Sequence, residues 1–284
     1  MMLSAAQAEL GRVFVKALSV LPLPFLRDTP NIVARVRGYG TESIKRHKRM
    51  LLSGELTEKS TFFSKILEND NNGKAVLSDS DVEIEASNFI VAGSDTTAVT
   101  LTYLIWAVLQ HPEVRAKIEE EVLELKQGAA LEELEKMKWL NAAIEETLRL
   151  YGAAPGALPR VVPPQGALFQ GYHLAKGTIV VTQSYTLHRD ETIFQSPMEW
   201  RPERWLNPTA QMREAFMPFG AGSRICLGIH LARAELLYSA VEFFRRMPGM
   251  AKVSSQTTKE DMEFENYFLI APRAHKCLIT IRET

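Results

Sequence analysis

Cys226 lies in the segment FGAGSRICLG, directly before an apolar stretch with helical periodicity. A thiol in that place faces the free N–H groups of a helix start and the positive end of its dipole, which favour the thiolate. Gly222 and Gly228 carry no side chain where a flat partner would approach the backbone. Arg224 offers a fork of donors for carboxylates, and Phe219 could cover the sulfur. These residue types predict a heme whose iron is bound by the Cys226 thiolate, a ligand that favours O–O cleavage. A structural cysteine in a glycine turn explains Cys226 alone, but not the whole segment.

A second candidate lies within a long apolar stretch, from Val82 to Gln110, that contains no proline. Its length and composition predict one helix buried on most sides, with N-cap residues just before it. Gly93 would weaken such a helix, and Asp95 and Thr96 place polar groups in an apolar environment. Local rules broken in this way indicate a functional site. The alternative is a helix kink with satisfied hydroxyl groups.

Glu146 and Arg149 are three residues apart in a segment with helical periodicity, so they share one helix face and can pair. Taken alone, this spacing favours a solvated surface ion pair, which contributes less than about 1 kcal/mol.

The motifs together resemble those of the cytochrome P450 monooxygenases. The Cys226 segment resembles the family's heme-binding signature, the Glu146–Arg149 pair its Glu-x-x-Arg motif, and AGSDTT at 92–97 its oxygen-binding groove. The segment RPERW at 201–205 is similar to the family's Pro-Glu-Arg-Phe motif, with Trp205 in place of Phe. The resemblance implies the C-terminal portion of the cytochrome P450 fold, mainly α with small β-sheets.

The resemblance also implies residue roles. Cys226 would bind the iron of heme b, and Asp95 and Thr96 would relay protons to bound oxygen. Arg204 would join Glu146 and Arg149 in a buried charge network. The remaining implied heme contacts are Gly93, Arg160, Phe219, Gly222, Arg224 and Gly228. His188 is either a structural residue or a second propionate contact.

By the same resemblance the reaction would insert one atom of O2 into a small lipophilic substrate. Electrons would come from NADPH through a separate flavoprotein reductase, and fungal secondary metabolism would be the setting. Two alternatives remain open. One is a non-redox heme-thiolate isomerase or dehydratase. The other is a non-functional or heme-free truncated fragment, since residues 1–284 would form a single partial domain without the family's N-terminal helices and membrane anchor.

Further helices are expected at 113–127, 131–137, 141–151 and 226–247, and strands at 167–172 and 178–182. An irregular stretch from 189 to 225 is expected between the second strand and the last helix. The Cys226 helix would bury a stripe that includes Leu227 and Leu231. The acidic run at 119–121 is expected to be a solvated face.

Composition narrows the partners and the compartment. The 284 residues carry a net charge of −1, which gives no electrostatic case for nucleic-acid binding. Two cysteines exclude a disulfide scaffold and favour a reducing compartment, compatible with the cytoplasmic face of the endoplasmic reticulum. No uninterrupted apolar run is long enough for a transmembrane segment, although the apolar stretch at 13–26 would allow a peripheral membrane contact.

Overall fold

A computed structural model describes residues 24–55 and 77–281, without the side chains of 24–33 and Asp79. Most of the apolar stretch at 13–26, proposed above as a membrane contact, lies outside these residues. The chain divides into two compact units between Ala92 and Gly93, within helix α4. Each unit is described by itself.

The first unit contains α2 (Pro24–Leu52) and the first half of α4 (Asp79–Gln110). A reciprocal cap starts α4, because Ser78 Oγ accepts from the Asp81 N–H and Asp81 Oδ2 accepts from the Ser78 N–H. Ile44 of α2 forms a small buried cluster with Val82 and Ala86 of α4. This capping agrees with the helix start expected from the sequence.

A close approach between these two helices depends on Gly40. A Cβ atom at Gly40 would lie 2.9 Å from the Glu83 carbonyl oxygen, which is closer than real side chains allow. Next to it, Thr41 Oγ1 donates to Glu83 Oε2 over 2.9 Å. Glycine at this position therefore lets the helix backbones meet.

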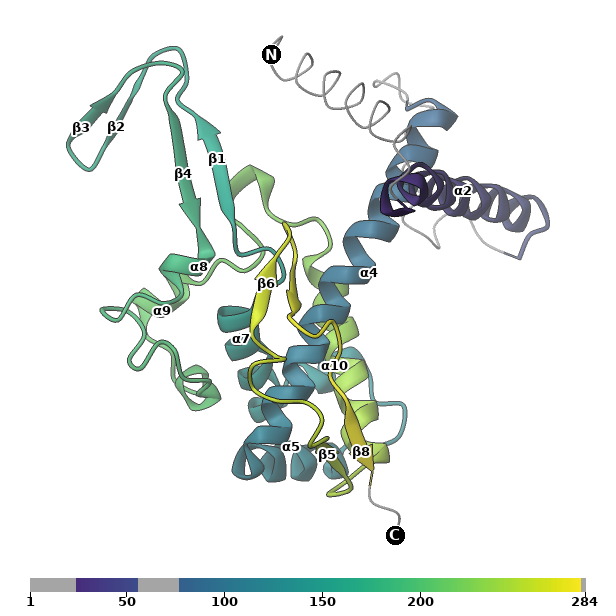
Figure 1. Ribbon diagram of the computed structural model, residues 1–284, viewed down its shortest axis with the longest axis vertical. Helices are drawn as coiled ribbons and strands as arrows, with labels where there is room; N and C mark the ends of the chain where they lie inside the picture. The colour runs from purple at the N-terminus through teal and green to yellow at the C-terminus, as the bar shows by residue number, and fades with distance from the viewer. Residues whose placement is uncertain (1–23, 56–76, 282–284) are drawn as a thin grey trace. The chain divides into compact units, whose positions relative to one another are not determined.

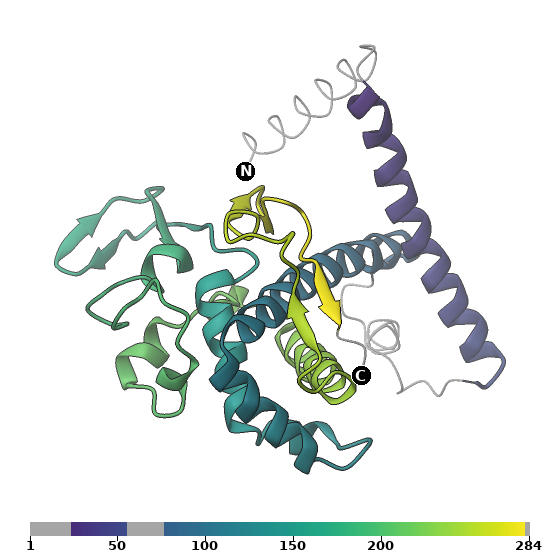
Figure 2. The same cartoon turned by 60° about the horizontal axis from the view of Figure 1, so that its bottom comes forward.

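Helices form the core of the second unit (Figure 1). Leu104, Val108, Ile118, Leu140, Ile144 and Leu237, from four of these helices, are among its fully buried residues. The view turned by 60° shows α4 beside the helix of residues Ile229–Arg246, α10 (Figure 2). After α4 come α5 (Pro112–Glu124), α6 (Leu131–Leu134), α7 (Lys138–Tyr151), α8 (Ser184–Leu187), α9 (Ala210–Ala215) and α10 (Ile229–Arg246), with 3-10 turns η2 (Pro202–Trp205) and η3 (Gly222–Arg224).

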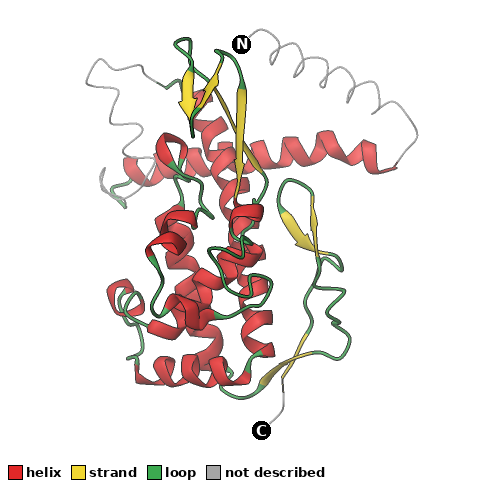
Figure 3. Cartoon of the chain, turned by 90° about the vertical axis from the view of Figure 1, so that its left-hand side faces the viewer, coloured by secondary structure: helices red, strands yellow, loops and turns green. Residues whose placement is uncertain are grey.

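Four two-stranded antiparallel sheets complete the described part of the second unit (Figure 3). The expected strand at 167–172 is a hairpin, because Gln170 and Gly171 have φ values of 48° and 86° and reverse the chain. The pairs are β1 (Ala157–Val161) with β4 (Ile179–Gln183), β2 (Ala167–Phe169) with β3 (Tyr172–Leu174), β5 (Ala251–Val253) with β8 (Ile279–Ile281), and β6 (Phe264–Asn266) with β7 (Ile270–Pro272). The predicted class, mainly α with small sheets, is confirmed.

Two burial predictions are wrong. Helix α4 is not buried on most sides: in the second unit it is exposed at Gly93 and Asp95 and becomes buried only from Thr100 onward, where the core helices reach it. In α10, which begins at Ile229, the apolar stripe is buried from Leu236, whereas Leu231 is 62% exposed and the preceding Leu227 70%. The apolar composition of the two helices therefore overestimates how much of their surface is buried near Asp95 and near Cys226.

One helix bears on the transmembrane prediction. Within α4, residues Ser80–Gln110 are long and apolar enough to cross a bilayer by length and composition, with a mean hydropathy of 1.2 in the best window. Counting uninterrupted apolar residues missed this helix because mean hydropathy tolerates small polar residues such as Ser94 and Thr96. Only 22% of that window is buried. One such helix is weak evidence for a membrane span, because core helices of soluble proteins pass the same test.

Candidate active site

The Cys226 segment forms a folded turn that ends just before α10. The Cys226 N–H donates to the Phe219 carbonyl oxygen over 2.9 Å, which closes the loop. Gly220 and Gly222 have φ values of 74° and 71°, in the left-handed region that favours glycine. A Cβ atom at Gly228 would lie 3.9 Å from Cys226 Sγ. The loop therefore presents an exposed thiol from a backbone conformation that its glycines make accessible.

Aromatic and apolar contacts hold the base of this loop. Phe219, and Phe216 ahead of it, pack against the main core. On the strand side, Leu158 of β1 lies 3.8 Å from the Cβ position at Gly220. The outer part is open, with Ile225 50% exposed. The loop is thus anchored on one side and presents an apolar, thiol-bearing surface on the other.

Two exposed arginines complete the donor set. Arg224 is part of the loop itself, in η3. Arg160 lies on β1, where its Nη1 donates only locally, to the Pro159 carbonyl oxygen over 2.9 Å. Because strand side chains alternate, Arg160 shares a strand face with Leu158, the residue next to Gly220. The structure therefore brings Phe219, Gly222, Arg224, Cys226 and Gly228 together in one turn, with the strand that carries Arg160 against it.

This donor set fits a heme. A thiolate is a soft ligand suited to iron, and two guanidinium groups match a cofactor that carries two carboxylates. A Cβ atom at Gly222 would meet nothing within 4 Å, so the backbone is open to a flat partner. Apolar groups such as Leu227 and Ile225 suit the ring of such a cofactor.

Behind the loop, Glu146 of α7 is fully buried and accepts from four different residues. Arg149 donates to it twice, Nε to Oε2 over 2.9 Å and Nη2 to Oε1 over 2.8 Å. Arg204 Nε donates to Oε1 over 3.1 Å, and the Arg201 N–H over 2.8 Å. Trp205 Nε1 donates to Oε2 over 2.8 Å. The structure thus places Glu146, Arg149 and Arg204 in one network, as the sequence predicts, and not on a solvated surface.

Arg149 extends this network to the main chain of the irregular stretch. Its Nη1 donates to the carbonyl oxygens of His188 and Pro197, over 2.6 and 2.7 Å. Its Nη2 reaches the Glu199 carbonyl oxygen over 3.1 Å. With every donor satisfied, a buried charge of this kind fixes loop geometry more than it adds net stability.

His188 is the structural alternative of the two left open by the sequence. Its side chain is 2% exposed, Nδ1 is 3.1 Å from the Arg149 carbonyl oxygen, and Nε2 accepts from the Met217 N–H over 2.9 Å. Acceptance at Nε2 requires a proton on Nδ1, so the ring is neutral. Burial lowers the pKa of His188 to about 4. Both nitrogens are occupied, and the ring links the end of α7 to the segment that leads into the Cys226 loop.

The second predicted site, on α4, is one continuous helix. Gly93 and Asp95 are exposed, and Thr96 is partly buried. One turn later, Thr100 Oγ1 donates to the Thr96 carbonyl oxygen over 2.8 Å, a contact that often bends a helix slightly. The placement of Asp95 and Thr96 beside a cofactor stays a prediction.

Sequence reasoning missed three contacts around α7. Trp205 was treated as a simple replacement for Phe, but its indole adds a donor to Glu146. Glu145 binds Arg233 of α10 in a two-point ion pair. Adjacent helix residues point about 100° apart, so the double glutamate could have signalled two separate partners. The acidic run at 119–121 is not simply solvated, because Glu121 accepts from the Trp139 and Leu140 N–H groups at the start of α7.

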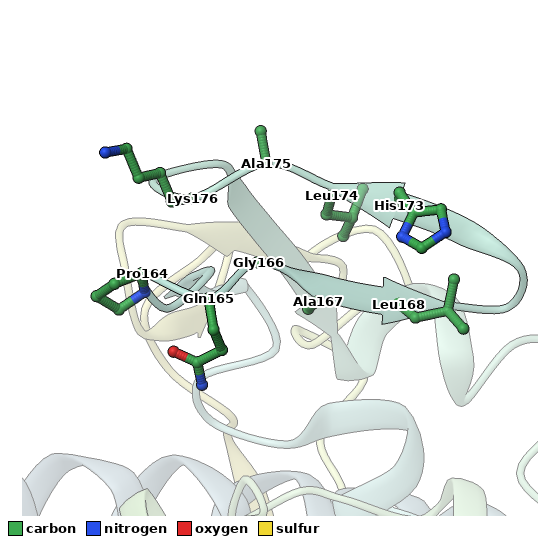
Figure 4. Close-up of a pocket in the computed structure, with 9 residues that line it drawn as sticks. All are labelled: Pro164, Gln165, Gly166, Ala167, Leu168, His173, Leu174, Ala175 and Lys176. Carbon is green, nitrogen blue, oxygen red and sulfur yellow. The ribbon is translucent and has the colours of Figure 1, made fainter.

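Two surface hollows lie outside this site. The larger, about 550 Å³, is lined by the β2–β3 hairpin and the turns beside it, including Gly166, Leu174 and Lys176 (Figure 4). The other, about 500 Å³, lies at the start of α5 beside Trp200. Neither is lined by a predicted site residue, and both are open to solvent, so neither is a stronger candidate than the Cys226 loop.

Comparison with known proteins points to one family. Residues 1–278 match the family model described as "Cytochrome P450". The chain is 40% identical over 264 residues to cytochrome P450 monooxygenase tazI of Aspergillus terreus, covering 92% of this chain and 54% of that protein. It is 40% identical to orf2 of Aspergillus niger, over 85% of this chain and 49% of that protein, and 41% identical to stcB of Emericella nidulans, over 79% and 43%. Both are also named cytochrome P450 monooxygenases. The chain spans about half the length of the curated relatives it matches.

Proposed function

The chain belongs to the cytochrome P450 family, and from that premise we propose that it supports a heme-thiolate monooxygenase reaction. The substrate would be a small lipophilic molecule that receives one oxygen atom from O2. NADPH would supply electrons through a separate flavoprotein reductase. The observation that carries this proposal is the Cys226 loop. Its glycines adopt positive φ values, and it presents the Cys226 thiol and Arg224 next to β1, the strand that carries Arg160.

Each residue of the loop has a role in holding the cofactor. When bound, heme supplies the activation of oxygen. Cys226 would hold the iron through its thiolate, and Arg160 and Arg224 would pair with the two propionates. Gly222 and Gly228 leave the backbone open, and Phe219 anchors the loop from the core side. The hydrogen bond from the Cys226 N–H to the Phe219 carbonyl oxygen closes the loop that carries the thiol.

The polar groups of α4 would handle protons. Gly93 leaves space on one side of the helix. Asp95, which is exposed, and the Thr96 hydroxyl would together relay protons, with Thr96 holding the proton at Oγ1. Both groups favour oxygen chemistry over the heme-thiolate isomerases and dehydratases, because those reactions need no external protons for oxygen cleavage.

The heme-free alternative starts from the same exposed surface that suits a heme. The Cys226 loop is exposed, and Leu227 and Leu231 beside it are 70% and 62% exposed. An apolar surface of this kind needs a cofactor or a partner to cover it.

The fungal relatives support secondary metabolism as the setting, and the cytoplasmic face of the endoplasmic reticulum is the location we propose.

Heme loading of the full 284-residue chain tests the proposal. The chain is mixed with hemin, separated from excess, reduced and exposed to CO. A red-shifted Soret band typical of thiolate ligation is expected. A soluble chain that retains no heme would contradict the proposal and favour the heme-free alternative.

Oxygen uptake separates the two heme-dependent functions. With NADPH, a flavoprotein reductase and a lipophilic substrate, a monooxygenase consumes O2. Thr96→Ala is expected to raise the share of reduced oxygen released as peroxide, because the proton at the Thr96 hydroxyl is lost. A heme-loaded chain that never consumes O2 would favour the isomerase or dehydratase.

A further inference from the structure

Glu145 and Arg233 join the two helices that flank the Cys226 loop. Arg233 lies seven residues after Cys226 on α10, and Glu145 lies on α7 next to the buried Glu146. Nη1 donates to Oε1 over 2.6 Å and Nη2 to Oε2 over 3.3 Å. The Arg233 side chain is 33% exposed and the Glu145 side chain 22%, so the pair is partly shielded from water. A two-point contact fixes the plane of the guanidinium group as well as its position.

The same guanidinium group contacts the base of the loop. The Arg233 Cζ atom lies over the Phe219 ring, 5.5 Å from its centroid, a geometry in which a cation attracts an aromatic face. Phe219 in turn accepts the Cys226 N–H through its carbonyl oxygen. A chain of direct contacts thus runs from Glu145 through Arg233 and Phe219 to Cys226.

We propose that Arg233, oriented by Glu145, is a positioning residue that holds Phe219 and thereby sets the Cys226 loop. Glu145 has two effects. It aligns the guanidinium plane, and it offsets the positive charge of Arg233 next to the Phe219 ring. The consequence for an iron ligand rests on the proposed function, whereas the consequence for the loop does not require heme.

Hydrogen exchange of the Cys226 amide in the heme-free 284-residue chain tests this proposal. Arg233→Gln removes the contact with Phe219, so the Cys226 amide is expected to exchange about fivefold faster. The amide of Leu237, in the buried part of α10, serves as the reference for general loss of stability. If Arg233→Gln lowers the yield of folded chain, Arg233→Lys keeps the charge but loses the fork, and a smaller acceleration at Cys226 is expected.

A charge swap separates positioning of the loop from simple helix pairing. The double variant Glu145→Arg with Arg233→Glu restores an ion pair between α7 and α10 but leaves no cation over Phe219. The Leu237 amide should exchange at the same rate as in the original protein, while the Cys226 amide stays fast. Recovery of both rates, or an unchanged Cys226 rate in Arg233→Gln, would overturn the proposal.

Arg246→Gln is the matched control. Arg246 pairs with Glu242 on the same helix, and their side chains are 74% and 50% exposed. The Arg246→Gln variant is therefore expected to leave the exchange rate of the Cys226 amide unchanged. The proposed function fails separately: a chain without the thiolate Soret band, but with the expected exchange rates, contradicts heme binding and leaves the positioning role of Arg233 standing.

Discussion

The scaffold around α7 and the Cys226 loop are neighbouring regions built in opposite ways. Glu146 and Arg149 in the scaffold are completely buried, and His188 uses both ring nitrogens in hydrogen bonds. In the loop, Cys226 and Arg224 are exposed and glycines set the backbone. In the scaffold these three buried side chains are hydrogen-bonded internally, whereas the loop presents its thiol and guanidinium groups outward.

This difference separates stability from chemistry. A buried network loses a great deal when one member is removed, because the remaining charge has no water to replace its partner. An exposed thiol contributes little to the stability of the fold, so this residue can be used for binding without a cost in stability. Substitutions in the scaffold should therefore unfold the chain, whereas those in the loop should change binding.

Glu146→Gln is the strongest test on the scaffold side. It leaves the buried Arg149 without its counter-charge, so the free energy of unfolding should fall by about 3–5 kcal/mol. Urea denaturation of the heme-free chain measures this change. Glu242→Gln, which affects an exposed pair, should cost less than about 0.5 kcal/mol. Equal losses in the two variants would remove the distinction between the two regions.

The pH dependence of stability tests the second scaffold residue. Burial lowers the pKa of His188 from 6.5 to about 4, so between these values the unfolded chain takes up a proton that the folded chain excludes. Stability from this group is complete above about pH 6.5 and falls by roughly 3 kcal/mol as the pH drops to about 4. His188→Gln should lose this part of the slope. A variant with the original slope would show that His188 does not titrate in this way.

Trp205→Phe restores the residue that the related motif carries. It removes one hydrogen bond to a charged acceptor, while Arg149 still donates to the same Glu146 oxygen. The free energy of unfolding should fall by about 1–2 kcal/mol. A Trp205→Phe variant as unstable as Glu146→Gln would mean that the indole, and not the ion pair, holds the network.

On the loop side, Cys226→Ala should have the smallest effect on stability. The side chain is exposed, so the free energy of unfolding should change by less than about 0.5 kcal/mol. Denaturation of the heme-free chain checks this value. A loss above about 2 kcal/mol would show that the thiol is part of the folded core.

The sequence predicted the scaffold better than the surface. Helix periodicity and i, i+3 spacing identified α7 and the Glu146–Arg149 pair, because both depend on contacts within one helix. The partners of Glu145 and Glu121 come from distant segments, and no local pattern specifies them. Burial of α4 was overestimated because composition reports the preference of a residue, and not whether the described elements cover it.

The Cys226 loop shows the same limit at the site itself. The sequence predicted that Gly222 and Gly228 leave room for a flat partner, but it did not predict that Gly220 and Gly222 adopt positive φ values. The contact of Arg233 with Phe219 was not predictable, because it depends on how the loop folds back against α10. Motif spacing thus located the residues, and only packing revealed what holds them.

The central claim is that Cys226 supplies the ligand from a loop that folds without it. The most direct measurement is the Soret band of the reduced, CO-treated chain for the original protein and Cys226→Ala side by side, after both are shown to have the same stability. We predict a thiolate-type band in the original protein and its complete loss in the variant. A variant that is equally stable and keeps that band would contradict the claim.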